Sequence, residues 1–521
     1  MRAVETVLLL VVLATVVATS ARRLRVPAPS LLVVAGVAVG VLPWTPPVVV
    51  PPDLVSLVVL PPLLYAAGEE MSPRDLRAVR RPVAILAVGL VLASAAAVGM
   101  VAAVVAPLPA SMAFVLGAVL ASTDPVAVAA LSRRLSLPPR IRVLVQAESL
   151  FNDATSLVLF RLAVSAAIAG GAVSVAGVGV EFALLAGGGV VVGLLVAGGV
   201  ALIRRRTADP VLETVIALVT PYLAYVLAES FGGSGVTAVV VTSVVLGSRL
   251  SRLTTAHVRL HLDAVYQTVV FILESVVFGL IGLQLPTLVR ALSGTDPDWP
   301  VQTLLITSGL IAVRFLWVFP LGWLMRSGIG AQRLNWRIST VVAWAGARGV
   351  VPLAAALSIP LTASDGTPVP QRNLVLLLAT TVIVITLVVQ GFTLAPLVRR
   401  AGVAKAPDEA RHERTVAELQ LVRASIAHLE HLADLQVAPD WMTDQLRQDL
   451  RVRIDHTGED DAGHPWTSSA RQIYRRLRRE LLAVESTELS RLHRDGAIDE
   501  TTRRSLQRAL DLEEARLGDQ E

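Results

Sequence analysis

Glu148-Ser149-Leu150-Phe151-Asn152-Asp153 is a polar run inside a stretch, residues 141–168, that is otherwise long and apolar enough to cross a lipid bilayer. A carboxylate at membrane depth costs about 2.5 kcal/mol or more. Two acids and two further polar side chains within about one and a half helical turns therefore need partners or a function. Such a run predicts an ion or proton site.

The composition indicates that this polar run belongs to a membrane protein. Hydrophobic residues make up 54% of the 521 residues, and the mean hydropathy of +0.64 exceeds that of a typical soluble globular chain. Charged residues are scarce and clustered up to about residue 400 and dense after it. We expect a transmembrane domain over residues 1–400 and a helical cytoplasmic tail over residues 401–521, for which regulation is a hypothesis.

Cysteine content and net charge narrow the possible chemistry and partners. Because the sequence contains no Cys, it can form no disulfide, thiolate metal site or Cys nucleophile. The formal net charge of +5 suits loops that face an anionic inner leaflet, so membrane lipid is a predicted partner and nucleic acid is not. We predict no cofactor.

Gly, Pro and charge clusters divide the first 400 residues into thirteen apolar segments, each a candidate for a transmembrane helix of roughly 20 residues. The predicted spans are 3–21, 26–42, 53–69, 82–106, 110–132, 141–168, 178–203, 209–231, 235–249, 259–286, 301–325, 334–359 and 372–398. The intervening loops alternate between basic and neutral or acidic, so the positive-inside rule places the N-terminus outside and the tail in the cytoplasm. The first basic cluster follows the first apolar segment, which favours a retained helix over a signal peptide.

Two of the predicted helices contain residues that break a helix near their middles. The fifth carries Ala121-Ser122-Thr123-Asp124-Pro125, and the twelfth carries Gly346-Ala347-Arg348-Gly349-Val350-Val351-Pro352. Proline removes a backbone donor and disfavours helical geometry in the residue before it. The two segments stand seven helices apart, an odd offset that reverses direction in the membrane. We therefore predict inverted six-helix repeats, each with one discontinuous helix, and these two helices crossing at a functional site.

Counting along the chain places two acids at a shared depth. Asp124 lies about 14 residues before Pro138, and Asp153 lies about 15 residues after it, which corresponds to roughly 20 Å of helix in each case. Ser149 and Asp153, four residues apart, share one helical face. With Thr123, these side chains offer only oxygen ligands, which hard monovalent cations such as Na⁺ prefer.

A buried carboxylate provides the minimal chemistry of cation exchange. Burial disfavours the charged form of an acid, so Asp153 can hold either a proton or a cation, but not comfortably both. If that site opens alternately to the two sides of the membrane, the two ions travel in opposite directions. One proton would then replace one monovalent cation, and transport would be electroneutral.

Four motifs resemble a known family in the same order along the chain. They are Asp124-Pro125, residues 148–153, Phe271-Ile272-Leu273-Glu274 and Gly346-Ala347-Arg348-Gly349. Together they closely resemble the sodium/proton antiporters of the NhaP and NHE type, the first monovalent cation:proton antiporter family. The resemblance covers nearly all of residues 1–400. It implies a core domain that moves against a dimerisation domain, alternating access at the site, and a homodimer in the cytoplasmic membrane.

The resemblance also assigns residues at the site. It implies that Asp153 is the acid that binds the ion and exchanges the proton, and that Asn152 is its partner in a pair associated with electroneutral members. Asp124 and Thr123 would be supporting groups, and Ser149 is similar to a serine that helps to coordinate the cation. The expected Na⁺ ligands are therefore Asp153, Asp124, Thr123 and Ser149.

The remaining intramembrane charges are expected to have architectural roles. The resemblance pairs Glu148 with Arg314, and we interpret this pair as structural, because opposite charges at depth stabilise each other. We expect Arg348 to support the helix crossing by neutralising either a helix C-terminus or Asp124. Two interpretations of Glu274 are open. It could act in gating or in electrostatics on the dimer side, or it could simply form a hydrogen bond at a helix kink.

One position departs from the family pattern. In many relatives an acid follows the double proline of the third segment, where this chain has Ala66. Glu69 or Glu70, about one turn further on, could replace it, or both could lie at the cytoplasmic surface beside Arg74. We favour the surface.

Other functional classes fit less well. The sequence has no HExxH or G-x-S-x-G motif in place for an intramembrane hydrolase, so we do not expect an enzyme. A cation channel would gain nothing from an acid that binds protons in competition with cations. We expect exchange of Na⁺, or Li⁺ as its smaller mimic, for H⁺, with a K⁺/H⁺ antiporter of the same fold as the alternative.

Overall fold

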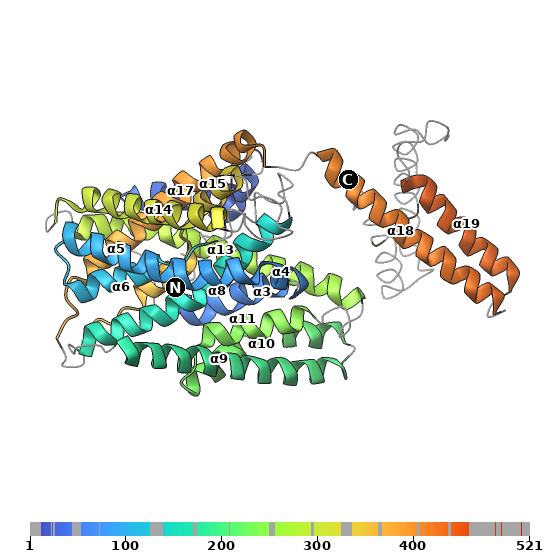
Figure 1. The fold of residues 1–521 in the computed structure, drawn as a ribbon, viewed down its shortest axis with the longest axis horizontal. Coiled ribbons are helices and arrows are strands. Elements are labelled where there is room, and N and C mark those ends of the chain that lie inside the picture. The colour runs from blue at the N-terminus through green and yellow to red at the C-terminus, as the bar shows by residue number, and fades with distance from the viewer. Residues whose placement is uncertain are drawn as a thin grey trace. The chain divides into compact units, whose positions relative to one another are not determined.

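The structure is a computed structural model of the chain, and it divides into two compact units, Met1–Lys405 and Ala406–Glu521. It describes residues 12–21, 23, 27–43, 54–71, 73–124, 139–169, 175–207, 209–248, 256–292, 296–324, 336–362, 367–403, 407–435, 439–457, 485, 491 and 512. Helices dominate both units, and in the first unit most of them run roughly parallel to one another (Figure 1). The predicted all-α fold class is confirmed.

The helices of the first unit follow the predicted apolar segments closely. After a short helix over Val12–Ala21 come α2 (Ala28–Val41), η1 (Leu54–Val59), α3 (Leu60–Glu69), α4 (Pro73–Ala84), η2 (Ile85–Leu90), α5 (Val91–Val105), α6 (Ala110–Leu120), α8 (Pro139–Ala169), α9 (Val175–Arg204), α10 (Pro210–Ser230), α11 (Gly235–Gly247), α13 (Ala256–Leu292), α14 (Trp299–Leu324), α15 (Trp336–Trp344), α16 (Val350–Leu357) and α17 (Arg372–Ala401). Within the described residues, 7 helices are long and apolar enough to cross a membrane. The total number of crossings and the inverted repeat remain predictions.

The predicted span 82–106 agrees to within three residues with the apolar stretch Val79–Val105 that could cross a membrane. The helix that contains this stretch starts earlier, at Pro73, because α4, η2 and α5 follow one another without a break. Val79, Val83 and Leu86 of this helix are buried, whereas Arg77 and Arg80 are exposed. Its first part is therefore amphipathic, and a search for purely apolar segments passes over such a helix.

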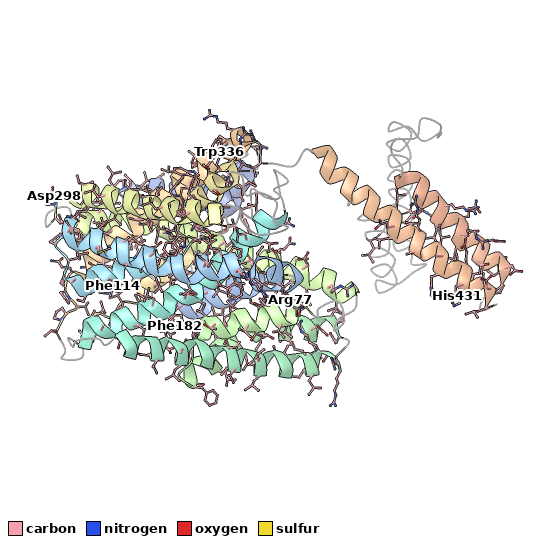
Figure 2. The ribbon with its side chains drawn as sticks, viewed as in Figure 1. Arg77, Phe114, Phe182, Asp298, Trp336 and His431 are labelled. Atoms are coloured by element: carbon pink, nitrogen blue, oxygen red, sulfur yellow. The ribbon has the colours of Figure 1, made fainter. Side chains whose placement is uncertain are left out.

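The outer surface of the first unit is apolar, as expected for a surface that faces lipid. Val104 is 85% exposed, Leu195 69% and Leu316 74%, and each belongs to a different long helix. Figure 2 draws the side chains that project from these helices. A soluble protein rarely exposes so large an apolar surface. The first unit is thus a multi-pass membrane domain.

The polar interior of this domain contrasts with its surface. Glu148, Arg314, Arg348 and Arg204 are all at most 2% exposed. Buried charges require partners, so these residues mark the places where the tertiary structure satisfies polar groups inside the membrane domain.

The second unit contains α18 (Pro407–Asp434) and α19 (Asp440–Thr457), which pack against each other (Figure 1). Val422 and Leu429 of α18 and Thr443 of α19 are buried. The expected amphipathic helices after residue 400 are therefore present. A regulatory role for this unit stays a prediction, and the basic stretch 471–480 lies outside the described residues.

Candidate functional site

Helical structure is interrupted at two places in the described membrane domain, after α6 and between α15 and α16, and the two non-helical segments lie against each other. α6 ends at Leu120 and continues as non-helical residues 121–124, while residues 345–349 separate α15 from α16. The Asp124 backbone N–H donates to the Ala347 carbonyl at 2.7 Å. Unwound backbone inside a membrane is tolerated only where its polar groups find partners, and this contact supplies one for each segment. Pro125, the expected breaker, lies outside the described residues.

Arg348 links the two interruptions. Its Nη1 donates to the carbonyls of Ser122 at 2.7 Å and Ala121 at 3.3 Å, which follow the C-terminus of α6. The backbone N–H of Arg348 donates to Thr386 Oγ1 of α17 at 3.2 Å. A guanidinium placed here neutralises the negative end of the α6 dipole. These contacts are the ones expected if Arg348 supports the C-terminal end of α6, and the role of Arg348 stays a prediction.

Two side chains of α8 hold the first interrupted segment through Thr123. Asn152 Nδ2 donates to Thr123 Oγ1 at 2.7 Å, and Asn152 Oδ1 accepts from the Thr123 backbone N–H at 3.4 Å. Ser149 Oγ donates to the Thr123 carbonyl at 2.5 Å. Both polar atoms of the Asn152 side-chain amide therefore bond to Thr123, which fixes residues 121–124 against α8.

Asp153 lies one residue beyond this clamp and is only 5% exposed. Its Oδ1 is buried and has no hydrogen-bond partner among the described residues. Asp124 and Arg348 are its charged neighbours, and the Ser122 hydroxyl lies near its carboxyl group without meeting the geometry of a hydrogen bond to Oδ1. Because an unsatisfied buried acceptor is costly, this oxygen is the atom of the site most in need of a proton or a cation.

Asp124 packs directly against the second interruption. Its side chain fills the space where a Cβ on Gly349 would lie, so only glycine fits there. The backbone of Gly349 has φ −132° and ψ −133°, which is not a left-handed conformation. Glycine is therefore required by the limited space and not by the backbone conformation. The two interrupted helices therefore interlock at Asp124 and Gly349, with the carboxylate facing the region of Asp153.

We expect the Gly349→Ala variant to lose most of its transport activity. The added methyl group must displace the Asp124 carboxylate, and overpacking costs about 1–3 kcal/mol, which corresponds to a loss of roughly 5- to 150-fold. Gly198→Ala is the matched control, because a Cβ on Gly198 of α9 meets nothing within 4 Å. Ion flux in vesicles with equal amounts of each variant measures the difference. Equal activity of the two variants would show that the position of Asp124 is unimportant.

Glu148 and Arg314 form a buried, bidentate ion pair behind the crossing. Arg314 Nη1 and Nη2 donate to Glu148 Oε1 at 2.6 Å and Oε2 at 3.1 Å. Arg314 Nε also donates to the Ala343 carbonyl at 3.1 Å, and Nη2 donates to the Val342 carbonyl at 3.2 Å. The pair therefore joins α8 and α14 to the C-terminal end of α15. Its position fits a structural role, which stays a prediction.

Three further acids lie on other helices. Glu274 is half-buried in α13, and its role remains a prediction. At the end of α3, Glu70 is exposed, whereas Glu69 is half-buried with its backbone against Gly247 of α11. Glu69 lies within electrostatic reach of Arg204. No contact among the described residues supports Glu69 or Glu70 as a cation ligand that replaces the acid missing at Ala66.

Two ion pairs among the described residues were not predicted from the sequence. Arg204, which lies just after the predicted span 178–203, is the last residue of α9 and is fully buried, with its Nε 3.8 Å from Glu213 Oε2 of α10. Arg161 Nη2 lies 2.5 Å from Glu229 Oε1. The available signal was that each pair consists of opposite charges inside or at the end of a predicted apolar span.

Comparisons with known proteins agree with this geometry. The family described as sodium/hydrogen exchanger, transmembrane, matches residues 8–400. A protein of Mycobacterium tuberculosis named as an uncharacterised Na⁺/H⁺ exchanger is 34% identical, with 98% of this chain and 96% of that protein covered. The sodium, potassium, lithium and rubidium/H⁺ antiporter of Bacillus subtilis is 30% identical, with 96% of this chain and 76% of that protein covered.

Solved structures show the same fold. The sodium proton antiporter MjNhaP1 of Methanocaldococcus jannaschii at pH 8 has a TM-score of 0.62 with this structure. The two chains are 21% identical, and the match covers 77% of this chain and 99% of the other.

Proposed function

Because this chain belongs to the transmembrane sodium/hydrogen exchanger family, we propose that it exchanges Na⁺ for H⁺ at the crossing of its two interrupted helices. Asp153 would be the group that binds the proton and the cation in turn. The observation that carries this assignment is the buried Asp153 Oδ1, which has no hydrogen-bond partner among the described residues. The remaining cation ligands would be oxygens of Asp124, Thr123 and Ser149.

Roles within the site follow from the contacts. Asn152 and Ser149 both bind Thr123, so they would set the position of the first interrupted segment relative to Asp153. Arg348 would hold the two segments together without entering the cation shell. Because Asp124 is an electrostatic neighbour of Asp153, a cation bound between two carboxylates would be favoured over an empty pair of charges.

The proposed exchange is electroneutral with one H⁺ for each Na⁺. A single acid that releases one proton to bind one monovalent cation carries the same net charge in both loaded states. The site would open alternately to each side of the membrane, with the N-terminus outside and the second unit in the cytoplasm. A homodimer in the cytoplasmic membrane and regulation by the second unit complete the proposal.

Proteoliposomes that contain the purified protein test the function directly. We expect addition of Na⁺ or Li⁺ to dissipate an imposed proton gradient, reported by a pH-sensitive dye, with no electrical current. A cation channel would instead pass a downhill current. K⁺ is measured in parallel, and faster exchange with K⁺ than with Na⁺ would identify the potassium antiporter of the same fold. No response to any of the three cations would contradict the proposal.

Competition between the two ions gives a second measurement. Where the acid is mostly protonated, lowering the pH by one unit should raise the apparent KM for Na⁺ about tenfold and leave the maximal rate unchanged, because one proton must leave for each cation bound. The slope of log KM against pH therefore counts the exchanged protons. A slope near two would reject the proposed one-to-one stoichiometry, and a slope of zero would reject competition at a shared acid.

A further inference from the structure

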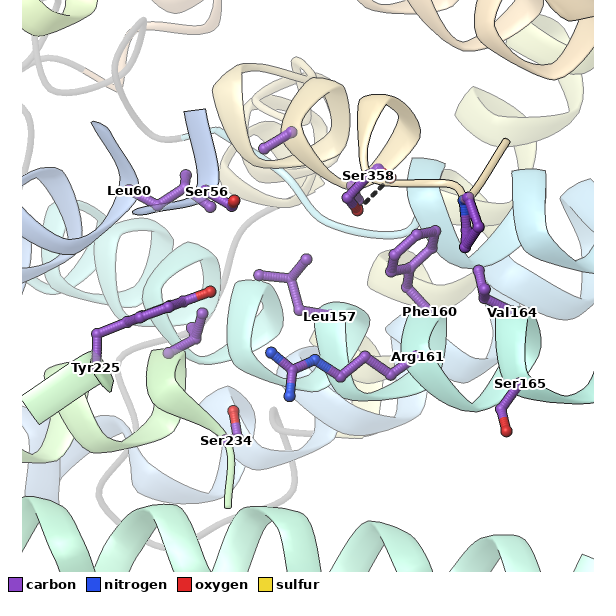
Figure 3. Close-up of a pocket in the computed structure, with 14 residues that line it drawn as sticks. Ser56, Leu60, Leu157, Phe160, Arg161, Val164, Ser165, Tyr225, Ser234 and Ser358 are labelled. Carbon is purple, nitrogen blue, oxygen red and sulfur yellow. Dashed lines mark hydrogen bonds between the residues drawn. The ribbon is translucent and has the colours of Figure 1, made fainter. Parts of the chain in front are cut away.

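A cavity of about 390 Å³ lies beside α8, next to the proposed site. Its lining comes from η1, α3, α8, α10, the start of α11 and the end of α16 (Figure 3). The polar residues of the lining are Ser56, Arg161, Ser165, Tyr225, Ser234 and Ser358, and the remaining lining residues are apolar. The hydroxyl groups and the guanidinium offer water hydrogen-bond partners in this cavity.

The cavity begins one helical turn from Asp153. Leu157 and Arg161 of the lining follow Asp153 at intervals of four residues, so the three share one face of α8. From Leu157 to Ser165 the cavity extends along α8 for roughly 12 Å. It therefore continues the face that carries Asp153 toward the end of α8 near Ala169. The sequence stretches that follow α8 and α10, residues 170–174 and 231–234, carry no charged side chain and are expected to lie outside.

Arg161, in the lining of this cavity, is paired with an acid that lies next to the lining residues. Arg161 extends from α8 and its Nη2 donates to Glu229 Oε1 of α10 at 2.5 Å, while the same oxygen accepts from the Gly235 backbone N–H at 2.9 Å. The side chains of Arg161 and Glu229 are 38% and 31% exposed, so neither is sealed inside the helix packing. Figure 3 shows the Arg161 guanidinium on the side of the cavity that carries Tyr225 and Ser234.

We propose that this cavity is the outer vestibule of the transport site, and that the pair formed by Arg161, in its lining, and Glu229 determines the charge that monovalent cations meet on their way to Asp153. This inference rests on the proposed function. While the pair is intact, the cationic guanidinium is neutralised and does not repel Na⁺. Because the pair joins α8 to α10, it also connects the helix that carries Asp153 to a second helix that lines the cavity.

Two substitutions that leave charges of opposite sign distinguish an effect of charge in the vestibule from a pair that only holds α8 to α10. Glu229→Gln and Arg161→Gln both break the pair, but the first leaves a positive charge in the cavity and the second leaves a negative one. At about 12 Å, one unit charge changes cation binding about two- to tenfold, depending on the effective dielectric constant. We expect Glu229→Gln to raise the apparent KM for Na⁺ supplied from outside by this factor, and Arg161→Gln to lower it.

Right-side-out and everted vesicles allow the apparent KM for Na⁺ to be measured separately from each side of the membrane. The apparent KM for Na⁺ from the cytoplasmic side should stay unchanged in both variants, and the double variant should return close to the wild-type value outside. Glu181→Gln is the matched control, because Glu181 is an exposed acid near the start of α9, whereas Glu229 is paired with the lining residue Arg161. KM shifts in the same direction for both single variants, or equal shifts from both sides, would overturn the proposal.

Thiol labelling tests the vestibule without changing its charge. The natural chain has no cysteine, so Ser165→Cys and Leu157→Cys each introduce a single thiol. A membrane-impermeant cationic thiol reagent added from outside should modify both variants. Modification of Leu157→Cys from the cytoplasmic side only would reject the vestibule even where wild-type exchange is intact. Absence of exchange in the wild-type protein would instead reject the proposed function.

Discussion

The Asp153→Asn variant is expected to lose all Na⁺-dependent proton movement and to remain folded. An amide neither binds a proton in this pH range nor carries the negative charge that a cation needs, so the variant cannot alternate between the two ions. Folding should survive, because Asp153 Oδ1 makes no hydrogen bond with any described residue and the amide is nearly isosteric. In vesicles, the response to Na⁺ should fall to that of vesicles without protein.

Two measurements make the Asp153→Asn result specific. Thermal melting in detergent should give a Tm at or above the wild-type value, because the substitution removes a buried acid. Asp263→Asn is the matched control, since Asp263 is an exposed acid of α13 outside the site, and this variant should exchange ions normally. Retained exchange in Asp153→Asn would move the ion-binding role to another residue, with Asp124 the first candidate.

The Arg314→Ala variant should have the largest effect on stability. Arg314 neutralises Glu148 and donates to the carbonyls of Ala343 and Val342, and both partners of the ion pair are almost fully buried. Removing one member of a buried pair leaves an uncompensated charge and costs about 3–5 kcal/mol. We expect a large fall in Tm and in the yield of folded protein, measured by thermal melting and size-exclusion chromatography.

Controls separate this structural effect from one on transport. Arg400→Ala removes an exposed arginine at the end of α17 and should leave Tm within error of the wild type. The double variant Glu148→Ala/Arg314→Ala removes both charges and should recover part of the lost stability. If Arg314→Ala instead kept its Tm and lost exchange, the ion pair would take part in transport and the structural interpretation would be wrong.

Membrane insertion explains why the helices were predictable from local sequence. Whether about 20 residues cross a bilayer depends mainly on their own composition, and the backbone of each helix satisfies itself. The spans over α8, α9 and α10 accordingly agree with the structure to within three residues at each end. The amphipathic start of α4 was missed, because half of its surface is charged.

Prediction of the site depended on residues that are unusual at membrane depth. Asp124, Asp153 and Arg348 stand out in any apolar stretch, and Pro125 and Gly349 mark interruptions. Counting from the intervening loop placed the two acids at one depth, and the structure brings their segments together. The sequence left open whether Arg348 interacts with a helix C-terminus or with Asp124, because a guanidinium interacts favourably with both.

The sequence by itself determined that this chain is a helical membrane protein with acids and broken helices at mid-membrane, because those properties follow from residue composition over one or two dozen positions. Only the tertiary structure decided that Arg161 meets Glu229, that Arg204 is buried against Glu213, and that Asp124 fills the space beside Gly349. These contacts depend on how each helix is rotated about its axis. A helix that is apolar on nearly every side, such as α9, carries no local pattern that fixes this rotation, so packing against its neighbours sets it.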